Sequence, residues 1–270
     1  MPSIAAAVLE IKQLDELARC DSPIHRLDAR AKVLVAIIFC GTVMSFGTHD
    51  LSALLPFFIF PAVMIARSNL PPLFILKKMA FLCPFVFIVA LFNPALDRTI
   101  VVHLGSVGIS GGWMSFFSIV VRFFLTAGTA LVLVGVTGFV AICQALEQMG
   151  VPQVFAAQLL FLYRYIFVLA EEGKRMSSAR ELRAYGSAGL GIASFSPMIG
   201  YLLLRTWSRA ERIHMAMRAR GFDGAFQAPA TSHFGKAEMM HLIGWTMLFA
   251  FMRAENMSRL LGTLILGSLS

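Results

Sequence analysis

The chain has 270 residues, of which 58% are hydrophobic and only 14% are charged, whereas about a quarter of the residues are charged in a typical soluble domain. The hydrophobic residues come in blocks, which favours lipid over a water-soluble core as their surroundings. The net charge of +8 does not indicate a nucleic-acid partner, because the basic residues flank apolar blocks, as in the cytoplasmic loops of membrane proteins.

The apolar blocks predict an all-α polytopic membrane bundle with about five transmembrane helices. The blocks cover residues 33–46, 51–66, 79–92, 113–141 and 239–252. A transmembrane helix needs about 20 apolar residues, so the first three blocks must recruit flanking residues, thin the bilayer or lie partly inside the bundle. Residues 260–269 leave open a sixth, short membrane element.

Basic residues predict the orientation of these helices. Lys and Arg before the first block, after the second and after the fourth favour the cytoplasmic side at those places. The short loops at 48–50 and 97–103 are then expected outside, with the amino terminus inside and the carboxyl terminus outside. We expect Lys77 and Lys78 to lie in a basic connection before the third block.

The central region is mixed and basic, and we expect two long helices joined by a glycine-rich turn there. Its apolar stretches at 154–170 and 192–204 favour helices at or under the cytoplasmic membrane surface, with a true span as the alternative for either stretch. The predicted division is therefore 1–143 with four transmembrane helices, 144–238 as a cytoplasmic region, and 239–270 as a last transmembrane helix and tail.

Two segments of the central region match each other. When residues 212–222 are aligned with 175–185, Arg220 falls on Arg183, Gly221 on Ala184 and Phe222 on Tyr185. Each segment carries a cation at a predicted helix end, where the backbone dipole favours positive charge. The small residue after each arginine would let a partner approach closely, and a guanidinium can bind a carboxylate or backbone carbonyls there. Arg180 is the rival of Arg183, because it also follows an alanine.

Other chemistry-bearing residues give weaker indications. Arg122 lies within the fourth block, where a charge is costly, so it must face the bundle, a cavity or the headgroups. The histidines and cysteines lack metal-site spacing. A phosphate-binding glycine loop is absent from the sequence. We therefore expect no cofactor, no bound metal and no ATP hydrolysis on this chain.

The residues just described resemble a known family. The polar segment 22–32, Ser-Pro-Ile-His-Arg-Leu-Asp-Ala-Arg-Ala-Lys, is similar to the segment before the first span of CbiQ and EcfT proteins. These are the transmembrane components of energy-coupling factor ABC transporters. Ala219-Arg220-Gly221 resembles the second of that family's two Ala-Arg-Gly coupling motifs. Leu182-Arg183-Ala184 occupies the place of the first motif but departs from its pattern, which leaves Arg180 and Arg183 as alternatives.

The resemblance implies a non-catalytic coupling subunit in the bacterial inner membrane. Two long coupling helices would place their arginines in grooves of two copies of a cytoplasmic ABC ATPase, whose closure would tilt a separate substrate-binding membrane subunit. The metal-uptake branch is favoured, so the imported substrate would be cobalt, with nickel or a vitamin as alternatives. A competing class, an integral membrane enzyme, would need an acid–base or metal cluster, which the sequence lacks. A membrane scaffold is a third class, which composition alone leaves open. No nucleic-acid partner is expected.

Overall fold

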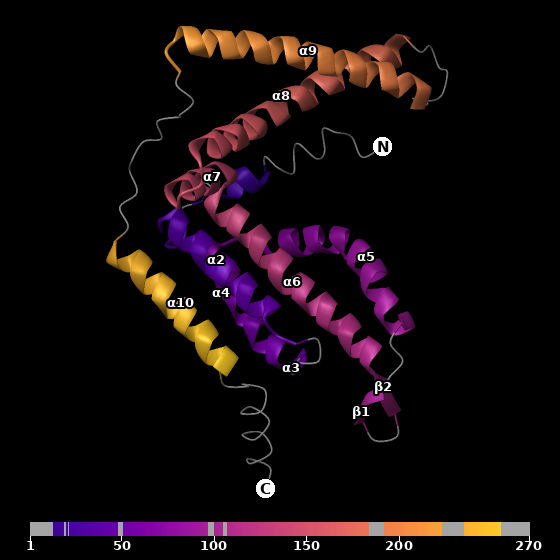
Figure 1. The fold of residues 1–270 in the computed structure, drawn as a ribbon, viewed down its shortest axis with the longest axis vertical. Helices are drawn as coiled ribbons and strands as arrows, with labels where there is room; N and C mark the ends of the chain where they lie inside the picture. The colour runs from indigo at the N-terminus through magenta and orange to yellow at the C-terminus, as the bar shows by residue number, and fades with distance from the viewer. Residues whose placement is uncertain are drawn as a thin grey trace. The chain divides into compact units, whose positions relative to one another are not determined.

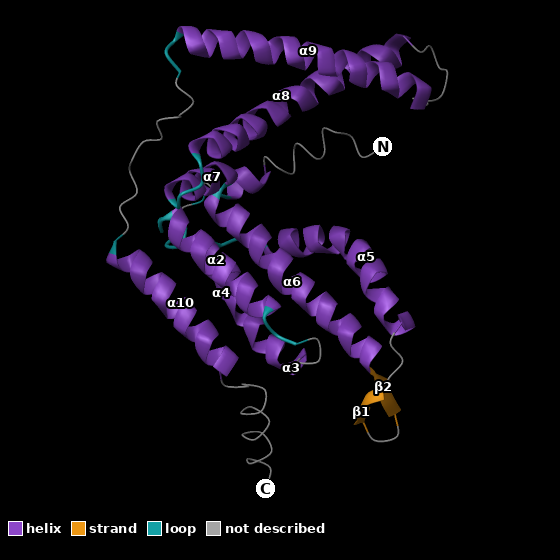
Figure 2. Ribbon diagram, in the orientation of Figure 1, coloured by secondary structure: helices purple, strands orange, loops and turns teal. Residues whose placement is uncertain are grey.

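The structure, a computed structural model, describes residues 13–18, 20, 22–47, 51–96, 100–104, 107–183, 192–222 and 235–254. The chain forms two compact units. The bundle unit contains Leu17–Gly138 and Thr231–Ser270, and the paired-helix unit contains Met1–Glu16 and Phe139–Ala230. Helices dominate both units (Figures 1 and 2).

The bundle unit is built from α2 (Ala29–Met44), α3 (Leu51–Leu54), the 3₁₀ helix η1 (Leu55–Phe58), α4 (Ile59–Ser68), α5 (Pro72–Leu96), α6 (Gly111–Thr137) and α10 (Lys236–Ala254). A short antiparallel hairpin, β1 (Ile100–Leu104) and β2 (Val107–Ser110), precedes α6. The paired-helix unit holds α7 (Phe139–Gln148), α8 (Gln153–Arg183) and α9 (Ile192–Ala219). The predicted all-α membrane bundle is confirmed. The predicted three-part division of the chain stays a prediction.

Four described helical segments are long and apolar enough to cross a membrane: Leu51–Ser68, Pro72–Pro94, Gly111–Thr137 and Gln153–Arg183. The first three correspond to the second, third and fourth apolar blocks. The fourth is α8, so length and composition also permit the alternative in which this helix is a span. The expected short element at 260–269 lies outside the described residues.

Three local features differ from the sequence-based expectation. The third block does not begin at residue 79, because α5 starts at Pro72 and carries Lys77 and Lys78 on the helix itself. Part of the loop expected at 97–103 forms strand β1. The fourth block is two helices, since Gly138 adopts a φ of 76° and so ends α6 in a left-handed conformation that glycine tolerates best.

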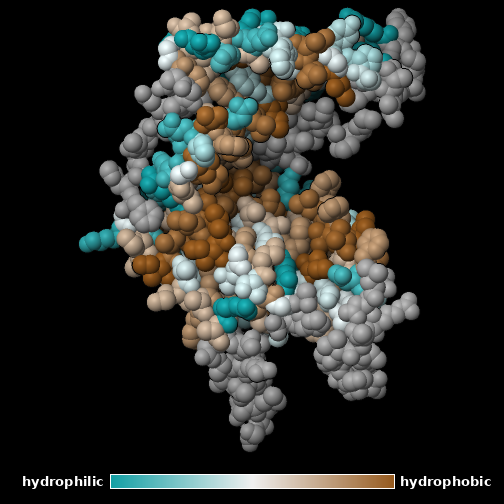
Figure 3. All heavy atoms as spheres, viewed as in Figure 1, coloured by the Kyte–Doolittle hydropathy of each residue, from teal (hydrophilic) through white to brown (hydrophobic). Residues whose placement is uncertain are grey.

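The surface of the bundle unit is suited to lipid. Phe81 and Leu73 on α5 are 85% and 80% exposed, which would be costly in water for side chains of this size. Figure 3 shows apolar residues, in brown, along the surface of α5 and neighbouring helices. Because exposed apolar side chains cost little in hydrocarbon, this surface supports the membrane environment predicted from composition.

Aromatic rings fill the centre of the bundle unit. The ring of Phe39 on α2 lies 4.7 Å from that of Phe60 on α4 and 5.3 Å from that of Phe249 on α10. Trp245 of α10 completes the cluster, 4.8 Å from Phe60 in an edge-to-face arrangement. Such pairs contribute about 0.5–1.5 kcal/mol each beyond burial. This cluster joins α10 to helices that precede it by nearly 200 residues in the sequence.

The polar segment 22–32 folds into a cap for the amino end of α2. Asp28 is the N-cap residue, and its side chain accepts a hydrogen bond of 2.9 Å from the backbone N–H of Arg30. The buried Lys32 donates from Nζ to the carbonyl of His25 at 3.3 Å. His25 Nε2 donates to the carbonyl of Leu17 at 3.2 Å, because a carbonyl only accepts, and His25 Nδ1 shares a hydrogen bond of 2.6 Å with Ser22 Oγ. The segment therefore fixes where α2 begins.

The carboxyl end of α2 is capped by two arginines from other helices. Arg122 of α6 donates to the carbonyls of Phe46 and Gly47 at 2.8 and 2.7 Å. Arg253 of α10 donates to the carbonyl of Ser45 at 3.0 Å, and its guanidinium lies 4.3 Å from the centroid of the Phe46 ring. With 16 residues, α2 rises only about 24 Å, less than the roughly 30 Å hydrocarbon core. The carbonyls of Ser45, Phe46 and Gly47, which follow the last residue of α2, therefore take donors from side chains of the protein.

The hydrogen bonds of Arg122 show the direction of its side chain. Its guanidinium faces the bundle and binds backbone carbonyls, which favours the bundle-facing alternative over a position among the headgroups. The charge is thus used as a strong hydrogen-bond donor for a helix end, which offsets part of the cost of placing it at membrane depth.

We predict that Arg122→Leu destabilises the bundle unit. The substitution removes two charge-assisted hydrogen bonds and leaves the carbonyls of Phe46 and Gly47 without these donors, a loss of about 2–3 kcal/mol. The midpoint of thermal unfolding in detergent should fall clearly. Arg212→Leu, which removes an exposed arginine on α9, is the matched control and should leave the midpoint nearly unchanged. Equal midpoints for the two variants would contradict a capping role for Arg122.

Candidate functional site

The paired-helix unit carries both matched arginine segments, each at the carboxyl end of a long helix. Arg183 is the last residue of α8, and Arg220 directly follows the last residue of α9. The predicted pair of long helices is confirmed. The intervening turn at 184–191, including Ala184, lies outside the described residues.

Two contacts set how α8 and α9 lie against each other. Glu172 of α8 forms a salt bridge of 2.7 Å with Arg205 near the middle of α9. Nearer the start of α8, the ring of Phe161 lies 6.5 Å from that of Phe222, just beyond the end of α9. Later residues of α8 thus meet earlier parts of α9, so the two helices run in opposite directions.

This antiparallel arrangement separates the two motif arginines. Phe222 lies beside Phe161, and Arg183 follows Phe161 by 22 residues of continuous helix. At 1.5 Å per residue this corresponds to roughly 30 Å along α8. Figure 1 shows the same arrangement, with the carboxyl ends of α8 and α9 at opposite ends of the pair. The structure therefore does not bring the two arginines together.

The end of α9 has the backbone geometry of a Schellman motif. Gly221 has a φ of 80°, the N–H of Phe222 donates to the carbonyl of Met217 at 3.0 Å, and the N–H of Gly221 donates to that of Arg218 at 3.0 Å. A left-handed residue at this position is usually glycine because other side chains are strained there. An added Cβ on Gly221 would meet nothing within 4 Å. In this chain the glycine is thus favoured by the backbone conformation, a reason independent of the close approach of a partner that the sequence predicted.

The predicted site residues differ in exposure. Arg183, Ala219, Arg220 and Gly221 are exposed. Arg180 is half-buried and interacts within the chain. The guanidinium groups of Arg183 and Arg220 form no salt bridge with any residue that the structure describes. Both arginines are therefore accessible to a second protein, and Arg183 is more accessible than Arg180.

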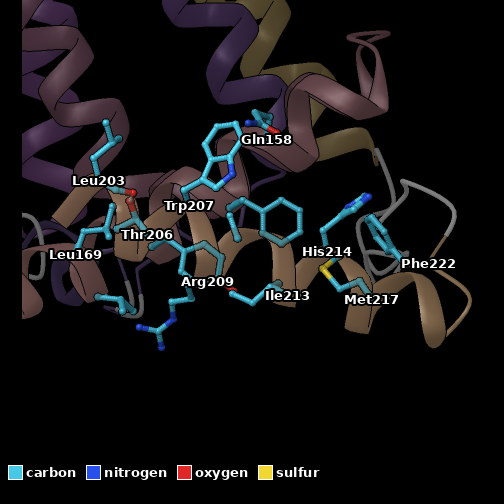
Figure 4. Close-up of a pocket in the computed structure, with 14 residues that line it drawn as sticks. Gln158, Leu169, Leu203, Thr206, Trp207, Arg209, Ile213, His214, Met217 and Phe222 are labelled. Carbon is cyan, nitrogen blue, oxygen red and sulfur yellow. Dashed lines mark hydrogen bonds between the residues drawn. The ribbon is translucent and has the colours of Figure 1, made fainter. Parts of the chain in front are cut away.

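An aromatic groove lies between α8 and α9 (Figure 4). Its cavity of about 450 Å³ is lined mainly by apolar and aromatic side chains. The lining includes Phe161 and Tyr165 from α8, Trp207 and Met217 from α9, and Phe222. In Figure 4, Met217, His214 and Phe222 lie together at one end of the groove. Sequence reasoning missed this groove, although the aromatic that ends each matched segment was a signal for it.

No metal-binding cluster occurs among the described positions. They contain no group of three or more His, Cys, Asp or Glu side chains arranged to bind one. His214 lines the groove and His241 lies on α10, so these two histidines belong to different units. The paired-helix unit thus presents an apolar, aromatic groove and exposed arginines at its helix ends.

Comparison with known proteins identifies the family. Residues 21–231 match the CbiQ family, which is described as cobalt transport protein. The chain belongs to the CbiQ family. The match covers the polar segment 22–32, the bundle helices up to α6 and both long helices of the paired-helix unit.

Several relatives agree with this assignment. The chain is 26% identical to the energy-coupling factor transporter transmembrane protein EcfT of Listeria innocua, over 76% of this chain and 82% of the relative. It is 28% identical to the EcfT protein of Heliobacterium modesticaldum, over 78% of this chain and 84% of the relative. A fused cobalt transport protein, CbiMQ, of Methanocorpusculum labreanum is 33% identical over 94 residues, which are 34% of this chain and only 16% of that protein.

These findings define the class of the protein. It is a transmembrane component of the energy-coupling factor type in a cobalt transport family, and a multi-pass protein of the plasma membrane. The resemblance inferred from the polar segment and the Ala-Arg-Gly motif is confirmed. The roles of the individual arginines stay predictions.

We predict that Gly221→Ala frays the end of α9. A Cβ in the left-handed conformation costs about 1–2 kcal/mol, so hydrogen exchange at the amide of Phe222 should accelerate by roughly 5- to 30-fold. Gly200→Ala is the matched control, since an added Cβ on Gly200 within α9 also meets nothing within 4 Å and alanine favours a helix interior. If both variants exchanged at the same rate, the conformational requirement at Gly221 would be refuted.

Proposed function

We propose that this protein is the coupling subunit of an ATP-driven cobalt importer. In this proposal Arg183 and Arg220 each bind one of two copies of a cytoplasmic ABC ATPase, and this chain performs no catalysis itself. The observation that carries the proposal is the placement of two accessible guanidinium groups at opposite ends of one helix pair, roughly 30 Å apart along α8. Two separated, similar cationic ends suit a partner that presents the same groove twice.

The side chain of Arg220 is not needed to cap α9. The N–H groups of Gly221 and Phe222 already satisfy the carbonyls of Arg218 and Met217, so capping does not need the guanidinium. Its exposure leaves its five donors available for a carboxylate or backbone carbonyls of a partner. The Schellman geometry would hold the arginine at a fixed position on the surface, which reduces the entropy lost on binding.

Arg183 is preferred over Arg180 as the first coupling arginine. It is exposed at the last residue of α8, whereas Arg180 is half-buried and interacts within the chain. An arginine that already has intramolecular contacts would have to give them up before binding a partner.

Transport would follow from movement of the helix pair. Closure of the ATPase dimer on ATP would shift α8 and α9, and this movement would tilt a separate membrane subunit that holds the substrate. Large apolar side chains on α9 remain exposed, among them Leu203, Leu204 and Trp207. They offer a surface that a second membrane subunit, or lipid, would cover. Cobalt is preferred as substrate because the family is described as cobalt transport protein; nickel or a vitamin is the alternative.

A membrane enzyme and a scaffold are the competing functions. An enzyme would need an acid–base or metal cluster, and the described residues hold no group of three or more His, Cys, Asp or Glu side chains that could bind a metal. A scaffold would not need two accessible arginines in matched segments. Isolation of the protein with its partners separates these functions, since only the proposed coupling subunit should bring down an ABC ATPase.

We predict that Arg220→Glu releases the ATPase and that Arg183→Glu weakens its binding. Loss of a buried charge-assisted contact, together with the like-charge repulsion that Glu would add against a carboxylate, should reduce affinity by about thirtyfold or more. Co-purification of the cognate ABC ATPase in detergent measures this effect.

Arg218→Glu is the matched control for charge. Arg218 is exposed on the same turn, but lies about 200° around the helix from Arg220. It should retain the ATPase if specific contacts rather than net charge determine binding. Undiminished assembly and ATP-dependent uptake in the Arg183→Glu, Arg220→Glu double variant would eliminate the docking role.

The substrate is tested by uptake of radiolabelled cobalt and nickel into vesicles that contain the complete complex. We expect ATP-dependent cobalt uptake that excess nickel competes for only weakly. Preferential uptake of nickel, or no uptake of either metal by a complex that still hydrolyses ATP, would contradict cobalt as the substrate.

A further inference from the structure

Phe222 is the residue after the Ala-Arg-Gly motif. Its backbone completes the end of α9, and its side chain packs against α8. Its backbone N–H closes the Schellman motif on Met217. Its ring is half-buried and meets Phe161 of α8 edge-on, with 6.5 Å between ring centroids and 72° between the ring planes. The same two rings line the groove between the helices. One residue therefore joins the arginine-bearing end of α9 to the neighbouring helix.

This contact fixes Arg220 with respect to both helices. The left-handed Gly221 turns the chain so that Phe222 returns toward α8. Arg220 is thus held between the last turn of α9 on one side and an anchored aromatic on the other. A force applied at the guanidinium would reach α8 through Phe222 as well as reaching α9 through the backbone.

A second contact lies further along the helix pair. The salt bridge between Glu172 and Arg205 lies 11 residues further along α8 than Phe161, which corresponds to about 16 Å of helix. The side chain of Glu172 is only 15% exposed, whereas that of Arg205 is 67% exposed, so solvent screens this ion pair in part. Two separated contacts, one aromatic and one ionic, therefore join the two helices.

We propose that Phe222 is a positioning residue that makes α8 and α9 move as one lever when an ATPase binds Arg220. The inference rests on the proposed function, and it assigns a role to the aromatic rather than to the arginine. Without the ring, Arg220 would still reach its partner, but the movement of α9 would no longer be transmitted fully to α8.

The test uses the complete complex reconstituted in vesicles and compares Phe222→Ala with Phe222→Tyr. Phe222→Ala should keep its ATPase while the number of ATP molecules hydrolysed per cobalt ion imported rises by about 3- to 10-fold. Loss of one aromatic contact changes the population of joined helix pairs by about this factor, and only joined pairs would couple hydrolysis to import. Phe222→Tyr keeps the ring and should restore the native ratio. Phe161→Ala should match Phe222→Ala, and the double variant should be no worse than either single variant, because both remove the same contact.

A distance measurement tests the lever directly. Spin labels at Ser178→Cys on α8 and Ala216→Cys on α9, both exposed positions, are introduced after the four native cysteines have been replaced. With Phe222 present, the distance distribution should be the same before and after ATP binding. With Phe222→Ala, ATP should broaden or shift it.

The outcomes separate this inference from the proposed function. If Arg220→Glu retains the ATPase, the docking proposal fails, whatever Phe222 does. If Arg220→Glu releases the ATPase but Phe222→Ala keeps both the native hydrolysis ratio and an ATP-independent distance, the lever role of Phe222 is wrong. Loss of ATPase binding in Phe222→Ala that Phe222→Tyr does not restore would also overturn it.

Discussion

The left-handed turn at the end of α9 determines how this protein presents its second motif. Gly221 allows the chain to reverse, Phe222 closes the hydrogen bonds of the helix end, and its ring contacts α8. The turn thus performs three tasks at once: it ends the helix, leaves Arg220 exposed and ties the end of one helix to the body of the other. An arginine on a frayed helix end would have the same charge but no fixed position.

In the bundle unit, side chains bind the backbone groups at both ends of α2. The helix is too short to place both ends in water if it crosses the membrane, so its terminal backbone groups need partners within the protein. Asp28 supplies the acceptor at the start, and Arg122 and Arg253 supply donors at the end. Because those arginines come from α6 and α10, the capping also joins three helices, as the aromatic cluster around Phe39 and Phe249 does. Arg122 and Arg253 in this membrane unit therefore bind backbone carbonyls, whereas Arg183 and Arg220 on the paired helices remain exposed.

Much of the fold could be predicted from the spacing of apolar residues. A chain that crosses the hydrocarbon core must satisfy its backbone hydrogen bonds internally, and long apolar helices do this. The positions of α6, α8 and α9 could be predicted in this way, and the family resemblance came from short motifs. The break at Gly138 could not, since the apolar pattern continues across it and only the backbone angle reveals the turn. The hydrogen-bond acceptors of Arg122 could not be predicted either. They are backbone carbonyls about 75 residues away, and every residue has a carbonyl, so the sequence does not mark which ones bind an arginine. For the site, the matched segments predicted the two arginines. The left-handed conformation of Gly221 and the groove beside Phe222 were not predicted. They depend on how α8 and α9 cross, which the spacing of residue types in the sequence does not specify.

The central claim is that two arginines at opposite ends of one helix pair each engage a separate nucleotide-driven subunit. A structure of the assembled transporter, determined by electron cryomicroscopy with its ATPases bound, tests this most directly. The account predicts the guanidinium groups of Arg183 and Arg220 within hydrogen-bonding distance of two different ATPase copies. A structure in which either group faces lipid, or in which both contact the same ATPase copy, would contradict it.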